Sequence, residues 1–165
     1  MPLVYHQIAP VFDRHSRALI LGSIPSPKSR ETGFYYGHPQ NRFWPLLSHL
    51  LNEELPHTNS EKKELLLKNH IALWDVLASC EIKGADDHSI DSPIPNDINW
   101  LLDQCPVVGV FTAGKKATEL YRKFCYPKTG IESIYLPSTS PANRGCYPME
   151  RLLSDWNVLL KYISR

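Results

Sequence analysis

The sequence predicts an α/β fold, a three-layer α/β/α sandwich around a central, mainly parallel sheet of four strands. Four short apolar runs are typical of buried strands, and they cover residues 18–21, 71–76, 107–112 and 133–136. Amphipathic segments lie between and after these runs. Because parallel strands need crossover connections, which are usually helical, this alternation favours a parallel sheet. The 165 residues contain no internal repeat or linker, so residues 1–165 are expected to form a single domain.

The expected helices have local signals of their own. They are expected at residues 43–51, 61–69, 98–104, 115–124 and 149–163. Thr58 and Glu61 have the spacing of a capping box, which favours a helix start at this point. Asn96 and Asp97 are good capping residues ahead of the next helix. The last helix carries a broad apolar stripe made of Leu152, Leu153, Trp156, Leu159, Leu160 and Ile163.

The composition excludes several classes of protein. Hydrophobic residues make up 42% of the chain and charged residues 21%, which is typical of a folded domain. The net charge of +1 argues against extensive wrapping of nucleic acid, although one local basic face remains compatible with it. No apolar run approaches the roughly 20 residues that span a bilayer, and the N-terminal residues do not resemble a signal peptide. We therefore expect no membrane association and a cytoplasmic protein, associated with the nucleoid in a prokaryote.

The cysteines do not indicate a metal site. Cys80, Cys105, Cys125 and Cys146 include no C-x-x-C pair, so a zinc site or an iron–sulfur cluster has little support. Without an export signal, disulfides are not expected either. We interpret the four residues as buried or incidental thiols, and we expect no cofactor.

The fold class predicts where the functional site lies. In open parallel sheets, ligands bind outside the carboxyl ends of the strands. The segments that follow the four expected strands are residues 22–41, 77–87, 113–116 and 137–145, and the first and last are the richest in Gly, Pro, Ser and Asn. The site is therefore expected at this edge of the sheet. Residues 81–97 form the longest irregular stretch, which is expected to be a surface loop or a lid.

The first of these segments contains residues suited to a flat heterocyclic ligand. Gly22 has no Cβ, so it lets backbone amides near Ser23 and Ile24 approach a ligand, or it simply makes an ordinary turn. Tyr35 and Tyr36 offer ring faces on which a base can stack, an interaction of about 1–3 kcal/mol per base. Aromatic residues are more often part of a core, so either tyrosine alone is weak evidence.

Three polar residues near the expected site each have two interpretations. Asn41 can hold a water or bind an N–H and carbonyl edge through its amide, but its position also suits an N-cap of the helix at 43. His38 is a candidate general acid or phosphate ligand, or else a structural hydrogen-bonding residue. Asp75, at the end of the second strand, can polarise a water or cap the next helix.

The last segment is a rigid polar loop that can bind phosphate through hydroxyls, amides and one cation. Its candidate residues are Ser138, Thr139, Ser140, Asn143 and Arg144. Lys115 follows Gly114 at the expected start of a helix, which is a favourable place for an anion. A solvated turn is an equally good interpretation of both segments.

Four motifs carry a family resemblance. They are LILGSIPS at 19–26, YYGHPQNRFW at 35–44, GKKA at 114–117 and LPSTSPAN at 136–143. With these motifs, which span nearly the whole chain, the sequence resembles the uracil-DNA glycosylase superfamily. Its layout is similar to that of the mismatch-specific uracil/thymine glycosylases, and it looks most like the hypoxanthine-DNA (deoxyinosine) glycosylase branch. The second and fourth motifs are quite specific, whereas GKKA alone would mean little.

Two positions depart from the better-known branches of that superfamily. Ile24 stands where the mismatch glycosylases carry an asparagine that orients the attacking water. Leu136 stands where classical uracil glycosylases carry a histidine. In the hypoxanthine branch, the asparagine of the HPxNRFW motif is taken as the catalytic residue. The resemblance therefore implies that Asn41 is catalytic.

The resemblance also implies an activity and a set of contacts. It implies a monofunctional DNA glycosylase, without lyase activity or a metal, that hydrolyses the N-glycosidic bond of a deaminated base, preferably hypoxanthine, flipped out of DNA. Tyr36 is expected to stack on the flipped base. The other expected base-binding residues are Gly22, Ser23, Ile24, His38 and Asp75. The expected DNA contacts are Ser26, Lys115, Ser138, Thr139, Ser140, Asn143 and Arg144, with Ser140 near the wedge position. We expect the protein to act as a monomer.

Two other functions stay open. A mismatch-specific uracil/thymine-DNA glycosylase that has moved its catalytic group would have the same layout. A catalytically inactive α/β module that binds nucleic acid or a nucleotide is also compatible, because Ile24 and Leu136 replace polar groups with apolar ones.

Overall fold

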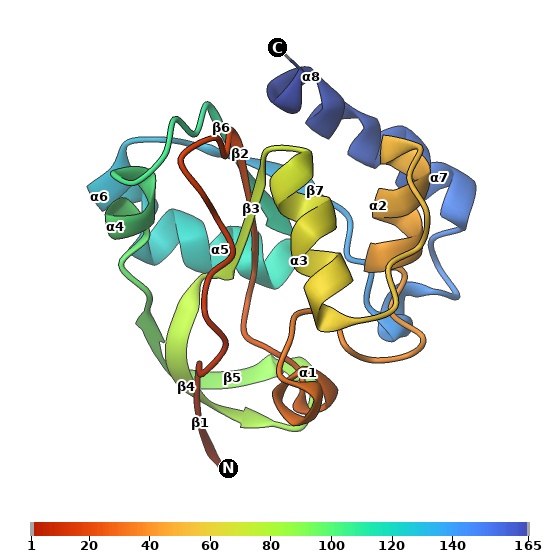
Figure 1. Ribbon diagram of the computed structural model, residues 1–165. Coiled ribbons are helices and arrows are strands. Elements are labelled where there is room, and N and C mark those ends of the chain that lie inside the picture. The colour runs from red at the N-terminus through yellow and green to blue at the C-terminus, as the bar shows by residue number, and fades with distance from the viewer. Residues whose placement is uncertain (1, 165) are drawn as a thin grey trace.

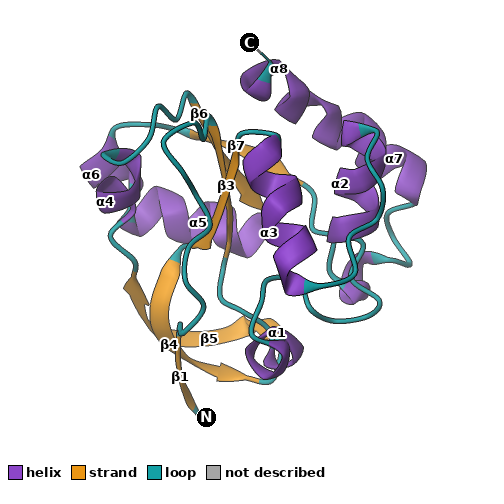
Figure 2. Cartoon of the chain, viewed as in Figure 1, coloured by secondary structure: helices purple, strands orange, loops and turns teal. Residues whose placement is uncertain are grey.

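Two β-sheets of different character form the framework of the protein (Figures 1 and 2). The structure is a computed structural model and describes residues 2–164. The central sheet has the strand order β3-β2-β6-β7 and consists of β2 (Ala18–Gly22), β3 (Ile71–Asp75), β6 (Gly109–Ala113) and β7 (Ser133–Leu136). The second sheet has the order β1-β4-β5 and consists of β1 (Leu3–Tyr5), β4 (Leu77–Lys83) and β5 (Asp86–Pro95).

All neighbouring strands of the central sheet run parallel, which confirms the expected fold class. Ala18 pairs with Ile71 on one side and with Gly109 on the other. β2 and β3 are buried along their whole length, as expected for strands of a sheet covered on both faces. The strand that was expected to begin at residue 107 begins two residues later, because its pairing with β2 starts at Gly109. Val108 lies before this paired segment and is exposed.

Helices cover both faces of the central sheet. In the view of Figure 1, α3 (Asn59–Lys68) lies in front of the sheet and α5 (Lys115–Phe124) lies behind it. The capping box is confirmed, since the Thr58 hydroxyl accepts from the Glu61 amide and the Glu61 carboxylate accepts from the Thr58 amide. Because Thr58 is the N-cap, α3 begins two residues earlier than expected.

The other helices agree with most of the expected ranges. They are α1 (Pro27–Thr32), α2 (Phe43–Leu51), α4 (Ile98–Leu102), α6 (Tyr126–Thr129), α7 (Met149–Trp156) and α8 (Leu160–Ile163). The short α1 and α6 were not predicted, because each has too few residues to show helical periodicity. The expected helix at 149–163 is helical throughout, with a 3₁₀ turn between α7 and α8. Within residues 2–164, no helix has both the length and the apolar character needed to cross a membrane.

The expected surface loop or lid at 81–97 is wrong. Most of this segment belongs to an antiparallel hairpin, in which Ser79 of β4 pairs with Ile94 of β5, and Lys83 pairs with Asp86. β5 is rich in Asp, Ser and Pro and is largely exposed, so it lacks the apolar alternation by which a strand is identified from sequence. The hairpin is stabilised by pairing with β1 and is therefore a fixed wall of the molecule.

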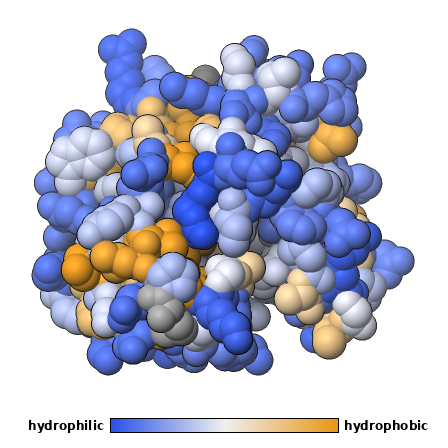
Figure 3. Space-filling view, turned by 90° about the horizontal axis from the view of Figure 1, so that it is seen from below, coloured by the Kyte–Doolittle hydropathy of each residue, from blue (hydrophilic) through white to orange (hydrophobic). Residues whose placement is uncertain are grey.

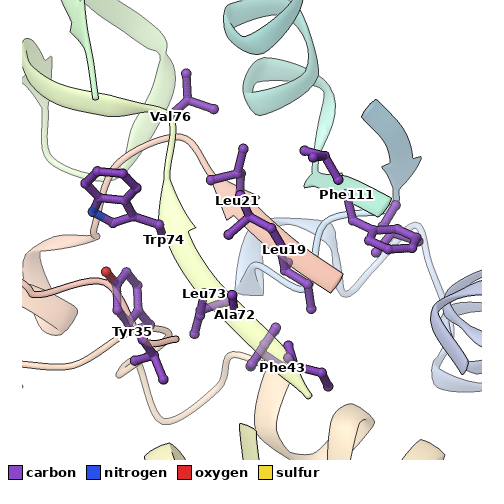
Figure 4. Close-up of a cluster of buried hydrophobic side chains, with 14 of the residues drawn as sticks. Leu19, Leu21, Tyr35, Phe43, Ala72, Leu73, Trp74, Val76 and Phe111 are labelled. Atoms are coloured by element: carbon purple, nitrogen blue, oxygen red, sulfur yellow. The ribbon is translucent and has the colours of Figure 1, made fainter. Parts of the chain in front are cut away.

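The hydrophobic core holds the ends of the central strands in place. Figure 4 shows Leu19, Leu73, Phe43 and Phe111 as parts of one buried cluster drawn from β2, β3, α2 and β6. Trp156 of α7 is fully buried in the same core, and its indole N–H donates to the carbonyl of Pro137 over 2.9 Å. The core thus anchors the loop that leaves the last strand.

Candidate active site

A pocket lies at the carboxyl ends of the parallel strands. These strand ends point to the lower end of the molecule in Figure 1. The volume of the pocket is about 280 Å³, and all four segments expected from the strand ends line it. The lining residues include Gly22, Ser23, Ile24, Ser26, Tyr36, His38, Asn41, Asp75, Ser138, Thr139 and Ser140. The structure thus brings every expected base-binding residue together with Asn41.

Figure 3 shows the end of the molecule on which this pocket lies. The surface is mostly hydrophilic and is hollowed between the side of the three-stranded sheet and the side of α7. Apolar side chains gather mainly on the side of the three-stranded sheet. A polar, concave surface at the strand ends suits a ligand with many hydrogen-bonding groups.

The ends of β2 and β3 pack tightly at the base of the pocket. Gly22 pairs in register with Asp75. A Cβ at Gly22 would lie 2.6 Å from Asp75 Oδ1 and 3.3 Å from the Tyr36 hydroxyl. Only glycine fits at this position, and its absent side chain lets the carboxylate and the phenol lie next to each other.

Asp75 is held by His6, a residue that the sequence analysis missed. Asp75 Oδ2 lies 2.9 Å from His6 Nε2, and the two side chains are 5% and 3% exposed. His6 also contacts the ring of Tyr35. Because 69 positions separate the two partners, no local motif could indicate the pair. Asp75 does not cap a helix, since the element that follows it is β4.

Tyr36 contributes an unpartnered hydroxyl to the pocket. Its ring stacks on Phe43 at a centroid separation of 4.0 Å, and its backbone is in the left-handed region with φ 53°, which is rare for a bulky residue. The hydroxyl is buried without a hydrogen-bond partner among the described residues. Burial, with the nearby Asp75, raises the pKa of this phenol well above its ordinary value, so it stays protonated. Tyr35 differs, because its buried hydroxyl donates to the carbonyl of Ala9.

One of the two polar groups of the Asn41 side chain is hydrogen-bonded. Its carbonyl oxygen accepts from the Phe43 amide over 2.9 Å and from the Thr139 hydroxyl over 2.7 Å. The N-cap of α2 is Arg42, which makes no side-chain cap bond, so the interpretation of Asn41 as the N-cap is wrong; Asn41 precedes the cap and accepts from the first amide of the helix. Among the described residues, nothing accepts from its amino group, and Asn41 lines the pocket. The two bonds fix the orientation of the amide and leave its N–H₂ group for a ligand.

Further hydrogen bonds join the loop around Asn41 to the last loop. The Arg42 amide donates to the carbonyl of Thr139 over 3.1 Å, and Arg42 Nη1 donates to the carbonyl of Tyr147 over 2.7 Å. Arg144 Nη1 donates to the carbonyl of Gln40 over 3.1 Å. These contacts connect segments about one hundred positions apart, and they hold the loop that carries Asn41 against the last loop.

The expected DNA contacts divide into two groups. Ser26 and Ser138 line the pocket, where Ser26 also caps α1. Asn143 lies outside the pocket and donates to the carbonyl of Ser138 over 2.9 Å. Lys115 and Arg144 are exposed, and Lys115 is the first residue of α5. In the structure, Asn143 therefore makes a hydrogen bond within its own loop. The DNA contacts of all seven residues stay a prediction.

The β4–β5 hairpin forms a wall of the pocket. Segment 77–87 was expected at the site, but its hairpin structure was not. Ile82, Gly84, Ala85 and Asp87 line this wall. The Ser23 hydroxyl donates to Asp87 Oδ1 over 3.0 Å. Asp87 is an exposed residue of the hairpin, but this bond turns its carboxylate into the pocket. The 64 positions between the partners explain why no sequence signal links them.

Two carboxylates, Asp75 and Asp87, determine the electrostatics of the pocket. Burial raises the pKa of the Asp87 carboxyl, and the charge of Asp75 raises it further, whereas the Ser23 hydrogen bond and the charges of His88 and Lys116 lower it. Within residues 2–164, no group of three or more His, Cys, Asp or Glu side chains is placed to hold a metal ion.

Comparison with known proteins agrees with this geometry. The family model of the uracil DNA glycosylase superfamily matches residues 9–161, which is most of the chain. The chain belongs to the uracil DNA glycosylase superfamily. This membership confirms the expected family and accounts for a pocket at the strand ends of a parallel sheet.

Individual members of the superfamily are similar over nearly the whole chain. The chain is 39% identical over 154 residues to a hypoxanthine DNA glycosylase of Methanosarcina acetivorans, covering 92% of this chain and 95% of the relative. It is 38% identical over 137 residues to a hypoxanthine DNA glycosylase of Methanosarcina barkeri, covering 82% and 85%. A solution NMR structure from Methanosarcina acetivorans, provisionally assigned as a uracil DNA glycosylase, has a TM-score of 0.83 at 31% identity and covers 99% of this chain and 100% of that chain.

The two unusual positions of this superfamily member have different environments. Ile24 lines the pocket with an apolar side chain that is 9% exposed. Leu136 ends β7 and is fully buried in the core, outside the pocket lining. The pocket therefore has no polar side chain at the Ile24 position. A side-chain amide is instead provided by Asn41, which lies in the next loop along the chain.

Proposed function

We propose that this protein is a monofunctional DNA glycosylase that hydrolyses the N-glycosidic bond of hypoxanthine in DNA. Superfamily membership and the two Methanosarcina relatives, each named a hypoxanthine DNA glycosylase, support this function. The observation that carries it is the oriented amide of Asn41, whose N–H₂ group is left for a ligand in a pocket where Ile24 offers only an apolar side chain.

The chemistry requires the base to leave as a stabilised group. The enzyme first flips the nucleotide out of the duplex into the pocket. Cleavage of the bond then produces an oxocarbenium-like sugar and a base that carries the bonding electron pair, so donors aimed at that base lower the barrier. Hypoxanthine presents an O6 acceptor and an N1–H donor. We assign the Asn41 amino group to O6 of the base or to the attacking water.

The other groups of the pocket suit the same base. Asp75, held by His6, is the candidate acceptor for N1–H, and the unpartnered Tyr36 hydroxyl is a further candidate contact. Phe43 supports the Tyr36 ring from one side, so a base can contact only the side toward the pocket. Backbone amides near Ser23 and Ile24 complete the contacts that we propose for the base.

The size of the pocket suits a single base. Its volume of about 280 Å³ is close to the lower end of the range for small-molecule pockets, about 300–1,000 Å³. A purine base is smaller than a drug-sized ligand, so we propose that a two-ring base lies in this pocket beside Tyr36.

The proposed substrate of this reaction is DNA. We propose that Lys115 and Arg144, both exposed, contact phosphates next to the flipped nucleotide, together with Ser26, Ser138, Thr139, Ser140 and Asn143. We propose that the protein acts as a monomer. We also propose that the enzyme works in the cytoplasm, where its DNA substrate lies in a prokaryote.

Single-turnover excision assays test the proposal. Duplexes with one deoxyinosine, deoxyxanthosine, deoxyuridine or mismatched thymidine are incubated with excess protein, and abasic sites are measured by alkaline strand cleavage. We expect the fastest release from deoxyinosine. Strong uracil or thymine release without hypoxanthine release would contradict the proposal and favour a mismatch-specific glycosylase. Lesion binding without any release would instead favour an inactive binding module.

A further inference from the structure

Asp87 is the one carboxylate of the pocket that comes from the hairpin rather than from the central sheet. It lines the pocket beside Ile82, Gly84 and Ala85 and is held by the Ser23 hydroxyl over 3.0 Å. Its neighbour Asp86 lies on the same strand but is absent from the pocket lining and accepts from the His88 amide over 3.0 Å. The two adjacent carboxylates therefore have different environments.

The surroundings of Asp87 favour its protonated form. Burial of its carboxyl group in the pocket is the main cause that raises the pKa of Asp87, and the like charge of Asp75 on β3 adds to this effect. The groups that lower the pKa of Asp87 are the Ser23 hydroxyl after β2, His88 from β5 and Lys116 from α5. The net effect is a pKa raised above the ordinary value of an aspartic acid.

The leaving group determines what such an acid can do. A purine has ring nitrogens with lone pairs besides the nitrogen of the glycosidic bond. If one of these nitrogens is protonated, the base leaves neutral rather than as an anion, and the bond breaks more easily. Uracil lacks such a ring nitrogen, so an acid of this kind would serve purine release specifically.

We propose that Asp87 is a catalytic residue that donates a proton to a ring nitrogen of the leaving purine. This inference rests on the proposed function. The C1′–N9 bond breaks and its electron pair goes to the base, while the Asp87 proton forms an N–H bond on that base. Water then forms the C1′–O bond and loses a proton to solvent, and a solvent proton restores Asp87. Hypoxanthine and an abasic site are the products.

Asp87→Asn tests the inference against Asp86→Asn as a matched control. Asparagine keeps the shape and an oxygen that can accept from Ser23, but it has no carboxyl proton to donate. With a deoxyinosine duplex under single turnover, we expect Asp87→Asn to lower the rate constant by roughly 10²-fold or more, the range of general acid catalysis. Asp86→Asn should match the unmodified protein.

The pH profile separates acid catalysis from a structural role. The unmodified protein should lose activity as the pH rises through the pKa of Asp87, because only the protonated form donates. Asp87→Asn should have no such alkaline limb, and Asp87→Glu should partly restore both the rate and the limb. An Asp87→Asn protein with the unmodified rate, or with an unchanged alkaline limb, would overturn the inference.

A thermal unfolding control keeps the result interpretable. A raised pKa in the folded protein means that the stability contribution of Asp87 is complete at low pH and is lost as the pH rises through that pKa. Asp87→Asn should therefore be at least as stable as the unmodified protein at neutral pH. If the unmodified protein itself releases no hypoxanthine, the proposed function fails; if it does and Asp87→Asn matches it, only the role of Asp87 fails.

Discussion

At the scale of single residues, the site depends on side chains that have polar groups without a hydrogen-bond partner among the described residues. The carbonyl oxygen of Asn41 is bonded twice, while its amino group is left for a ligand. The Tyr36 hydroxyl is buried without a partner among the described residues. Leaving a buried hydroxyl unpaired costs about 1–3 kcal/mol, so such a group indicates a function rather than stability.

Asn41→Ala should abolish most base release while lesion binding persists. Removing one donor aimed at a developing charge costs about 10²–10³-fold in rate, and we expect a loss of that size in single-turnover release of hypoxanthine. Gln40→Ala is the matched control, because Gln40 is the exposed neighbour and its hydrogen bonds within residues 2–164 are made by its backbone N–H and carbonyl, which alanine keeps. Release by Asn41→Ala at the rate of Gln40→Ala would remove Asn41 from the catalytic role.

Tyr36→Phe and Tyr35→Phe should have opposite effects. Tyr36→Phe removes an unpartnered hydroxyl, so thermal unfolding should show unchanged or higher stability, while excision falls roughly 10-fold for the loss of a hydrogen bond to the base. Tyr35→Phe removes a donor to the carbonyl of Ala9, so stability should fall by about 1 kcal/mol with excision little changed. A Tyr36→Phe protein with full excision would exclude a contact between this hydroxyl and the base.

At the scale of elements, the central feature is the meeting of β2, β3 and the β4–β5 hairpin. The pairing of Gly22 with Asp75 brings two strand ends together, and the bond from Ser23 to Asp87 attaches the hairpin to them. The pocket is therefore built from three elements, each of which is fixed by backbone pairing. A wall made of paired strands keeps its shape better than an irregular loop.

Gly22→Ala should damage both stability and activity. The new Cβ would lie 2.6 Å from Asp75 Oδ1, so the carboxylate or the strand must shift. Overpacking of this kind costs about 1–3 kcal/mol, which chemical denaturation would measure as a lower midpoint. Gly145→Ala is the control, since nothing lies within 4 Å of its added Cβ. Equal midpoints for the two variants would show that the packing at Gly22 tolerates a methyl group.

At the scale of the whole molecule, the near-neutral charge limits how DNA is bound. A net charge of +1 provides little long-range attraction to DNA, so we expect binding to depend on a few phosphate contacts at the end of the molecule that holds the pocket. α8 lies at the opposite end in Figure 1 and should not contact the duplex. The salt dependence of binding should therefore be shallow.

Arg144→Ala and Lys115→Ala should each reduce the salt dependence of lesion binding. Each lost phosphate contact lowers the slope of log K against log salt concentration by about one. Lys161→Ala on α8 is the control and should leave the slope unchanged. Binding titrations at several salt concentrations provide the measurement, and a slope that is equal in all three variants would exclude both proposed phosphate contacts.

The sequence determined the features that arise from local pattern. Apolar runs such as 18–21 and 71–76, and caps such as Thr58, depend on neighbours in the chain, so the sheet, most helices and the location of the site could be predicted. The motif resemblance added Asn41 to these features.

Only the tertiary structure decided which groups meet in the pocket. The bonds from Ser23 to Asp87, from His6 to Asp75 and from Thr139 to Asn41 join residues 64, 69 and 98 positions apart. Side chains that distant in sequence have no periodicity or spacing in common, and a polar, exposed strand such as β5 resembles a loop. The register of the sheet and the packing of the hairpin bring them together, so the position of Asp87 in the pocket could not be predicted from the chain alone.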